Sequence, residues 1–492
     1  MYILLEGALT STYIYGGKEM SSTSQASQRI SALLDENSFV EIGARVTSRS
    51  TDFGLKQTDT PSDGVVTGYG VIDGNLVYVY SQDAQVLGGS VGEMHAKKIA
   101  RLYDMAVKMG APVIGLIDST GMRLQEATDA LNAFGKIYEK QVIASGVVPQ
   151  ITAVFGNCGG GLSIIPALSD FTFMESSKGK MFVNSPNSLK GNYEEKCDTS
   201  SAKFQAENCG LVDVCADEST IYSEIRSLVS MLPSNNEDSD FYEDCTDDLN
   251  RNVDNFDGAA LDPAVAMTML SDNGAFFETK REYAREMVTG FIKLNGATVG
   301  VVANREALFD EEGKEKEKFA TNLTAAGCEK AASFVRFCDA FDLPILTLTN
   351  VTGFAATTCE EKHLAKNAAS LVAAFNSATV PKVNLVTKKA YGSAYVIMNS
   401  NADINICFVD SEIGTMEADI AAKILADGKS SDEVSKLADE YATLQNSAQS
   451  AARRGYVDEI IEPADARKYI IGAFEMLFSK RLEHPSKKHG TK

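Results

Sequence analysis

A glycine-rich stretch at residues 156–161 is the part of this sequence best suited to chemistry. It reads Gly-Asn-Cys-Gly-Gly-Gly and follows the apolar run 147–155, which predicts a buried strand. The next residues, 162–168, can begin a helix. Glycines between a strand and a helix let backbone N–H groups point at one spot, where they can bind a phosphate or an enolate oxygen. A tight turn packed in a core has the same composition, so this stretch alone leaves both interpretations open.

A second copy of the pattern lies 232 positions further along the chain. Pro381, like Pro149, precedes an apolar strand, which here runs into the small-residue turn Gly392-Ser393-Ala394. Four pairs of segments correspond in the same order: 66–74 with 288–296, 111–121 with 343–353, 149–161 with 381–393, and 210–213 with 455–458. The shared order predicts an internal duplication. Two such turns facing each other would make two anion sites in one cleft.

Side-chain catalysis has few candidates. The glycine spacing is neither G-x-G-x-x-G nor a P-loop. Of the four histidines, His484 and His489 lie in the tail, so few residues could form a histidine-centred triad or metal site. His95 is either a site residue or, more in keeping with its surroundings, a helix-packing residue. The two turns therefore favour catalysis by backbone donors without a metal, with a base borrowed from a substrate or cofactor.

Length, charge and cysteine use narrow the class of protein. The chain has 492 residues and a formal charge of −21, which argues against nucleic-acid binding. Nine scattered cysteines without a C-x-x-C pair predict reduced thiols. No secretory leader is evident, and no apolar run reaches the ~18 residues of a membrane span. We therefore expect a cytoplasmic protein without membrane insertion.

The elements that position the two turns fall into two halves. We expect an N-terminal extension (1–24, with Met20 as an alternative start), a first domain (25–233), an acidic linker (234–261) and a second domain (262–492). Local signals predict these elements: a helix over 25–36, a strand over 39–42, a hairpin over 65–80 with Asp73-Gly74 at its tip, a helix over 93–109 ended by Gly110, and a helix over 468–481.

From about residue 30 onward, the chain resembles the carboxyltransferase subunit of biotin-dependent acyl-CoA carboxylases and decarboxylases. The closest stretches are 64–70, 88–95, 108–112, 166–171, 334–341 and 389–392. Propionyl-CoA carboxylase β subunits and the α subunit of methylmalonyl-CoA decarboxylase are the most similar types. The resemblance implies an α/β fold of two tandem crotonase-like (ClpP/crotonase) ββα-spiral domains.

The resemblance also implies an assembly and a set of partners. The chain would form a hexamer of stacked dimers, with each active site between the N-half of one chain and the C-half of another. A hetero-oligomer with a paralogue is the alternative. Biotin would arrive on a separate carrier protein, loaded by a biotin carboxylase or unloaded by a membrane decarboxylase subunit, and no metal is implied.

Site residues carry over by motif. Gly160 and Gly161 would hold the enolate oxygen of the acyl-CoA thioester, and Ser393 and Ala394 would hold the ureido oxygen of biotin. The residues expected to bind substrate are Gly121, Arg123, Gly159, Gly392 and Val396. In the implied mechanism, carboxybiotin releases CO2, the biotin anion takes the α-proton of the acyl-CoA, and the enolate attacks CO2. An apolar residue at 396 suits a short aliphatic acyl chain. Arg123 either contacts a phosphate or forms a salt bridge with a neighbouring acid.

Departures from the family pattern gather in the second half. Where the family has Gly-Gly, the second turn has Gly392-Ser393, and segments 361–366 and 415–419 replace two glycine-containing family motifs. In the first half, residues 119–123 read Ser-Thr-Gly-Met-Arg where the family has Ser-Gly-Gly-Ala-Arg. A backbone donor survives replacement of glycine by serine if the turn keeps its backbone angles.

Three functions follow from these observations. The leading hypothesis is a carboxyltransferase subunit acting on a short-chain acyl-CoA, in either the carboxylating or the decarboxylating direction. The second is a catalytically impaired CoA-binding or assembly subunit that pairs with an active paralogue. The third, a biotin-independent crotonase-type enzyme, requires a carboxylate base near Gly160, for which Glu126 is the candidate.

Overall fold

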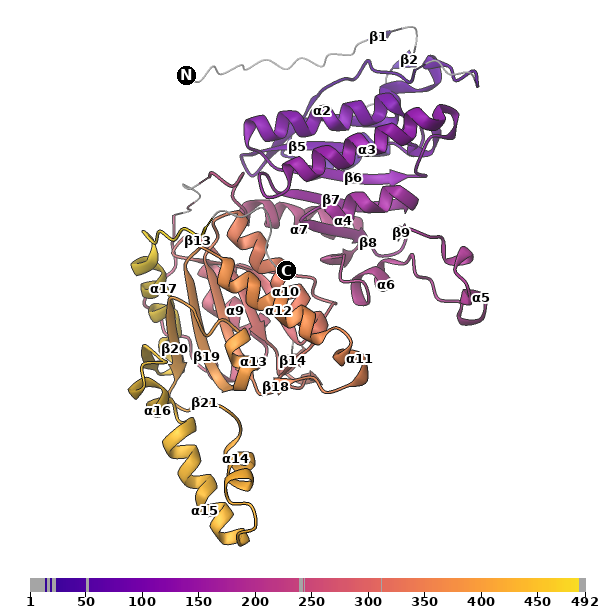
Figure 1. Cartoon of the computed structure of the whole chain (residues 1–492). Coiled ribbons are helices and arrows are strands. Elements are labelled where there is room, and N and C mark those ends of the chain that lie inside the picture. Colours follow the sequence, from indigo (N-terminus) through magenta and orange to yellow (C-terminus); the bar gives the residue numbers. More distant parts are fainter. Residues whose placement is uncertain are drawn as a thin grey trace.

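The computed structural model describes residues 24–485, except 50–52, 239–241, 243 and 311, together with two short N-terminal strands (Figure 1). These strands are β1 (Ile14–Tyr15) and β2 (Lys18–Glu19), and they pair antiparallel. The rest of the expected extension up to residue 23 lies outside the described residues. The described chain forms two α/β domains, which Figure 1 shows with the first domain above the second.

The first domain is built on a sheet in the order β10-β8-β7-β6-β5-β4-β3, with β9 paired to the end of β7. Strands β3, β4 and β5 are antiparallel, and the strands from β5 to β10 are parallel. The bounds are β3 Val40–Glu41, β4 Val65–Ile72, β5 Asn75–Gln82, β6 Val113–Ser119, β7 Gln150–Gly159, β8 Phe171–Glu175, β9 Lys180–Phe182 and β10 Val214–Ala216. The predicted hairpin is confirmed, with Asp73 and Gly74 in the left-handed region at φ 48° and 84°.

The second domain repeats this sheet in the order β22-β20-β19-β17-β13-β12-β11, with β21 paired to the end of β19. The bounds are β11 Phe276–Thr279, β12 Met287–Leu294, β13 Ala297–Asn304, β17 Ile345–Val351, β19 Lys382–Tyr391, β20 Ile404–Phe408, β21 Glu412–Gly414 and β22 Glu459–Ile461. Three further short pieces, β14 Ala307–Phe309, β15 Glu315–Lys318 and β16 Asn322–Leu323, lie between β13 and the next helix, and β18 Gly353–Phe354 follows β17.

The duplication extends to irregularities of hydrogen-bond register. Where β6 pairs with β7, two extra residues of β7 are accommodated directly before the glycine-rich turn, and β17 and β19 show the same irregularity. The flanking pairs correspond at the offset of 232: Ile117–Val154 and Ser119–Cys158 in the first sheet, Thr349–Val386 and Val351–Ala390 in the second. A shared register defect confirms that the two halves have one folding plan.

Helices cover both faces of each sheet. The bounds are α1 Gln25–Leu33, α2 Glu93–Met109, α3 Ala127–Ala144, α4 Ile164–Leu168, α5 Asn192–Glu195, α6 Ala202–Glu207, α7 Glu218–Met231, α8 Phe256–Ala259, α9 Pro263–Leu270, α10 Ala325–Ala340, α11 Thr358–Glu361, α12 Leu364–Ser377, α13 Gly392–Ile397, α14 Ala418–Leu425, α15 Ser431–Tyr441, α16 Ala448–Arg453 and α17 Ala466–Leu477. Helix α2 ends as predicted, at Gly110 in the left-handed conformation.

Three large apolar clusters hold these layers together. Helices α2 and α3 pack on the outer face of the first sheet, and α8, α9 and α17 pack on the outer face of the second. A shared cluster between the sheets joins α1 and α7 of the first domain to α10 and α12 of the second. Phe171 and Phe337 meet edge to face across this joint, with ring centroids 4.8 Å apart. The joint is therefore a packed core.

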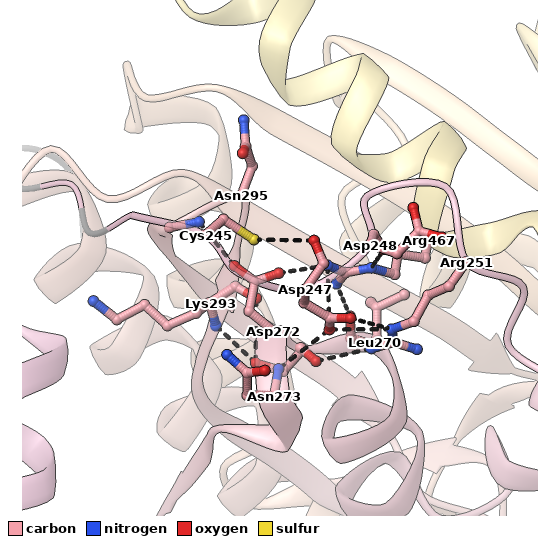
Figure 2. Close-up of polar contacts among 12 residues, drawn as sticks. Cys245, Asp247, Asp248, Arg251, Leu270, Asp272, Asn273, Lys293, Asn295 and Arg467 are labelled. Atoms are coloured by element: carbon pink, nitrogen blue, oxygen red, sulfur yellow. Dashed lines mark hydrogen bonds and ion pairs between the residues drawn. The ribbon is translucent and has the colours of Figure 1, made fainter.

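The downstream part of the expected acidic linker belongs structurally to the second domain. Val253, Phe256 and Ala259 lie in the core of that domain. The buried Arg467 of α17 donates to the backbone oxygen of Asp248 at 3.2 Å and pairs with Asp272 at 2.5 Å, as Figure 2 shows. Apolar burial and an arginine anchor therefore fix residues 244–261, which were expected to be a linker, against the second domain.

Candidate active site

The first turn, residues 159–163, joins β7 to α4 through a short 3-10 helix, Gly160–Ser163. Gly160 has φ 63°, in the left-handed region, and a Cβ added there would meet no atom within 4 Å. Gly161 is exposed, while Leu162 and Ser163 are buried. The backbone at Gly160 thus faces open space, which lets a ligand approach it closely, whereas a Cβ on Gly161 would lie 3.0 Å from the Tyr138 hydroxyl.

The neighbouring glycines are needed for packing. A Cβ on Gly156 would lie 2.0 Å from a carboxylate oxygen of Asp118, and one on Gly159 would lie 2.7 Å from the ring of Phe182. The stretch therefore contains both features considered from the sequence. Gly156 and Gly159 are needed for tight packing, and the backbone at Gly160 is open.

Two hydroxyl groups that the sequence did not predict as site residues donate to the carbonyls of the first turn. Ser163 Oγ donates to the Gly160 carbonyl oxygen at 2.8 Å. Tyr138, on α3, donates its hydroxyl to the Gly161 carbonyl oxygen at 2.5 Å. A hydroxyl three residues after a glycine was a weak local signal for Ser163, whereas Tyr138 is close only in the folded chain.

The second turn, residues 391–395, joins β19 to α13. Gly392 has φ 60°, and a Cβ added there would lie 3.2 Å from the Thr415 carbonyl oxygen. Ser393 is exposed and Ala394 is buried. Gly392 follows Gly160 by 232 residues and has nearly the same φ, so both turns begin with the same bend; the first continues as a 3-10 helix and the second as the α-helix α13.

Strand β21 and the loop after it support the second turn. The hydroxyl of Tyr391 donates to Glu412, and Lys389 pairs with Glu417 at 3.0 Å. Asn446 donates to the Met416 carbonyl oxygen at 2.9 Å. Burial, followed by the contact with Glu412, raises the pKa of Tyr391 well above its ordinary value, so the phenol stays protonated.

Arg123 does not lie open to a phosphate. Its side chain is fully buried and pairs with Asp63 at 2.5 Å and Glu126 at 2.9 Å. Of the two roles predicted for Arg123, the structure shows the salt bridge, and the substrate-binding assignment is corrected accordingly. The ion pairs still support the site indirectly, because they hold Arg123 in place. The backbone N–H of Arg123 donates to the Val91 carbonyl oxygen, and the backbone N–H of Val91 donates to the Gly121 carbonyl oxygen.

His95 has the packing role that its position predicted. Its backbone N–H donates to the Asp63 carboxylate at 2.7 Å, and its ring lies within 3.2 Å of the Gln82 amide nitrogen. Burial, followed by the nearby Arg123, lowers the pKa of His95 to about 3. The imidazole is therefore neutral at physiological pH and enclosed.

The carboxylate required by a hydratase-type reaction is also enclosed. Glu126 has a fully buried side chain, pairs with Arg123 and accepts the backbone N–H of Glu93 at 2.6 Å. A carboxylate that is ion-paired and shut off from solvent cannot reach the open side of Gly160. The crotonase-type alternative therefore loses its candidate base.

One chain does not bring the two turns together. The first turn lies beside α4 in the first domain, and the second turn begins α13 in the second domain; Figure 1 shows these elements well apart. Val396, on α13, is 54% exposed. A site that uses both turns therefore needs a second chain.

No helix among the described residues is long and apolar enough to cross a membrane. No group of three or more His, Cys, Asp or Glu side chains in the described part of the chain is arranged to hold a metal ion.

Comparison with known proteins decides the family. A model described as "Carboxyl transferase domain" matches residues 21–491. The chain belongs to the carboxyl transferase family. Its expected fold, two crotonase-like domains, and its expected class, a biotin-dependent carboxyltransferase or decarboxylase component, are both confirmed.

Relatives within this carboxyl transferase family match almost end to end. The chain is 41% identical to the methylmalonyl-CoA decarboxylase subunit alpha of Propionigenium modestum and 40% identical to the propionyl-CoA carboxylase beta chain of Roseobacter denitrificans. Each match covers 94% of this chain and 92% of the relative. The crystal structure of transcarboxylase 12S, described as a hexamer assembly with hydrolysed methylmalonyl-coenzyme A bound, matches with a TM-score of 0.87 and 34% identity. That match covers 95% of this chain and 92% of the other.

Proposed function

We propose that this chain is the carboxyltransferase subunit that moves a carboxyl group between carboxybiotin on a separate carrier protein and a short-chain acyl-CoA. The observation that carries the proposal is the repeated turn, with φ 63° at Gly160 and 60° at Gly392 after the same register irregularity. Two backbone donor sites of one geometry suit a reaction with two oxygens to stabilise, one on each reactant.

The first turn would act on the acyl-CoA. The N–H groups of Gly160 and Gly161 would donate to the thioester oxygen. Negative charge moves onto that oxygen as the α-proton leaves, so these hydrogen bonds strengthen during the reaction. The space beside Gly160, where a Cβ would meet nothing within 4 Å, admits the thioester.

The second turn would hold the ureido oxygen of biotin through the N–H groups of Ser393 and Ala394. Ser393 fits this role because it is not among the described residues with positive φ, so serine replaces the family glycine without backbone strain. Bound biotin would supply the carboxyl group and, after losing it, the base that takes the α-proton. This division suits a chain whose His95 and Glu126 are both enclosed.

The complete site would form between two chains. Because the turns lie in different domains, we propose that the first turn of one chain faces the second turn of another within a hexamer of stacked dimers. The hexamer assembly described for transcarboxylase 12S supports this arrangement. A hetero-oligomer with a paralogue would place the same two turns together.

The acyl group would be of the propionyl or methylmalonyl class. Val396 lies on the exposed side of α13, three residues after Ser393, where an apolar side chain suits a short aliphatic chain. The names of the two relatives agree with this class. A biotin carboxylase partner would set the carboxylating direction, and a membrane decarboxylase subunit the reverse.

The test is transfer of a labelled carboxyl group from methylmalonyl-CoA to free biotin or to a biotinylated carrier protein. We expect transfer by the purified full chain. Tight acyl-CoA binding in calorimetry with no transfer would contradict the proposal and favour the catalytically impaired CoA-binding subunit instead.

A further inference from the structure

The peptide between Gly160 and Gly161 is the part of the first turn that most needs to be held. In a trans peptide the C=O and N–H point in opposite directions, so a group that fixes the Gly160 carbonyl also fixes the Gly161 N–H. Gly160 lies at φ 63°, has no side chain and begins the short 3-10 helix, so its peptide takes its orientation from the hydrogen bonds that it receives.

Ser163 supplies such a restraint. Its hydroxyl donates to the Gly160 carbonyl oxygen at 2.8 Å, and its side chain is buried, with the residue only 5% exposed. If the peptide turned over, the buried Ser163 hydroxyl would lose this carbonyl as its acceptor. A buried donor without an acceptor is costly in free energy.

Tyr138 restrains the next peptide. Its hydroxyl, brought in by α3, donates to the Gly161 carbonyl oxygen at 2.5 Å, and the Ile164 N–H donates to the same oxygen, so the two bonds together fix the Gly161–Leu162 peptide. Partial burial raises the pKa of Tyr138 above its ordinary value of 10, so the hydroxyl is a donor at neutral pH. Gly161 is thus held at both of its peptides.

The second turn has no such pair. The residue 232 positions after Ser163 is Tyr395, and no described side chain donates to the carbonyl oxygen of Gly392 or Ser393. The hydroxyl restraints therefore belong to the first turn alone among the described residues.

We propose that Ser163 and Tyr138 are positioning residues that hold the Gly161 N–H toward the thioester oxygen. This inference rests on the proposed function of the first turn. Loss of one oxyanion donor commonly lowers kcat by about 100-fold to 1,000-fold. Loss of a group that only restrains the donor costs less, because the peptide still visits the productive orientation; one hydrogen bond corresponds to about fivefold to tenfold in kcat.

The experiment compares Ser163→Ala and Tyr138→Phe in the full assembled chain with biotinylated carrier and propionyl-CoA or methylmalonyl-CoA. We expect kcat to fall about fivefold to tenfold in each variant and further in the double variant, with KM for acyl-CoA changed less than about twofold. Ser163→Thr keeps the hydroxyl and should restore most of kcat. Unchanged kcat in both Ser163→Ala and Tyr138→Phe would overturn the proposal.

Matched controls separate positioning from general packing. Ser169→Ala removes a nearby serine hydroxyl that donates to the Ile165 carbonyl, and Tyr222→Phe removes a phenol hydroxyl that donates to Glu218. We expect both to keep kcat near that of the parent chain. Equal losses in the control variants would show that hydroxyl removal acts through stability and would overturn the positioning role.

A second readout does not depend on turnover. In a crystal structure of Ser163→Ala, we expect the Gly160–Gly161 peptide to turn over or to occupy two orientations. A single unchanged orientation would overturn the proposal even if the parent chain is active. If the parent chain transfers no carboxyl group, the proposed function fails, while this peptide orientation still decides whether Ser163 holds the turn.

Discussion

The first and second turns begin with the same backbone bend and have different supports. The loops beside the two turns also match. In the first domain the backbone N–H of Arg123 donates to the Val91 carbonyl oxygen at 2.9 Å. In the second domain the equivalent residues, 232 positions later, make the same bond, from the Ala355 N–H to the Leu323 carbonyl oxygen at 2.9 Å. The backbone is therefore inherited from the duplication down to individual hydrogen bonds.

The side chains around the two turns have diverged. The first turn is flanked by the buried Arg123 ion pairs and by the hydroxyls of Ser163 and Tyr138, whereas Ala355 and Tyr395 occupy the positions equivalent to Arg123 and Ser163 in the second half. Tyr391 and the loop after β21 support the second turn instead. The difference teaches that a donor site made of backbone tolerates replacement of its surroundings, provided that some contact holds each peptide.

The largest expected effect tests whether the buried arginine supports the first half. Replacing Arg123 by Met would leave Asp63 and Glu126 buried without their partner, so we expect the free energy of unfolding to fall by about 3–5 kcal/mol. Urea denaturation measures this loss. The exposed Arg49, which pairs with Glu93 and Asp129, is the control: Arg49→Met should lower the free energy of unfolding far less, because solvent screens these exposed pairs. Similar losses in the two variants would contradict the distinction.

The next prediction separates the roles of the turns. Gly160→Ala places a Cβ at positive φ in the space proposed for the thioester, so we expect carboxyl transfer to fall about 100-fold and acyl-CoA binding to weaken. Gly392→Ala should also impair transfer but leave acyl-CoA affinity, measured by calorimetry, near that of the parent chain. Weakened acyl-CoA binding in Gly392→Ala alone would reverse the assignment.

A smaller effect concerns pH. Below pH 6.5 an unfolded histidine binds a proton, but native His95 does not until about pH 3, so stability falls as the pH is lowered through this window. We expect His95 to contribute up to about 1.4 kcal/mol per pH unit to this loss. His95→Gln should show a shallower decline in urea midpoint between pH 6 and pH 5. Of the three histidines among the described residues, only His95 is buried, since His363 and His484 are exposed. An equal decline in both proteins would refute the prediction.

The smallest expected effect concerns the acyl chain. Val396→Ala shortens the apolar side chain proposed to contact it, so the preference for propionyl-CoA over acetyl-CoA, as a ratio of kcat/KM values, should fall about fivefold. The exposed Val409 lies outside the second turn, and Val409→Ala is the control. A ratio that does not move would exclude Val396 from substrate selection.

Much of the fold could be predicted from local signals. The Asp73-Gly74 hairpin and the helix ended by Gly110 depend on short-range backbone preferences. The offset of 232 depends on similar segments that recur in the same order. Both kinds of feature can be recognised from the amino-acid sequence. The helices expected over 25–36 and 468–481 were each placed slightly too far, because α1 ends at Leu33 and α17 at Leu477.

The rest depends on tertiary contacts. Nothing near Arg123 in sequence says that Asp63 will neutralise it, and the same holds for Tyr138 and the Gly161 carbonyl, 23 residues away. The acidic composition of 234–261 predicted a linker, but Arg467, from the far end of the chain, fixes its later part to the second domain. Charge pattern alone cannot distinguish a solvated acid from one that is paired.

Complementation between two inactive variants tests the central claim most directly. When Gly160→Ala and Gly392→Ala chains are mixed under dissociating conditions and reassembled, chains that share sites should form some sites with both turns intact. Random pairing in a two-fold dimer gives such sites about a quarter of the parent number, so we expect carboxyl transfer to recover toward about 25% of parental activity. No recovery in verified mixed assemblies would contradict a site shared between the first turn of one chain and the second turn of another.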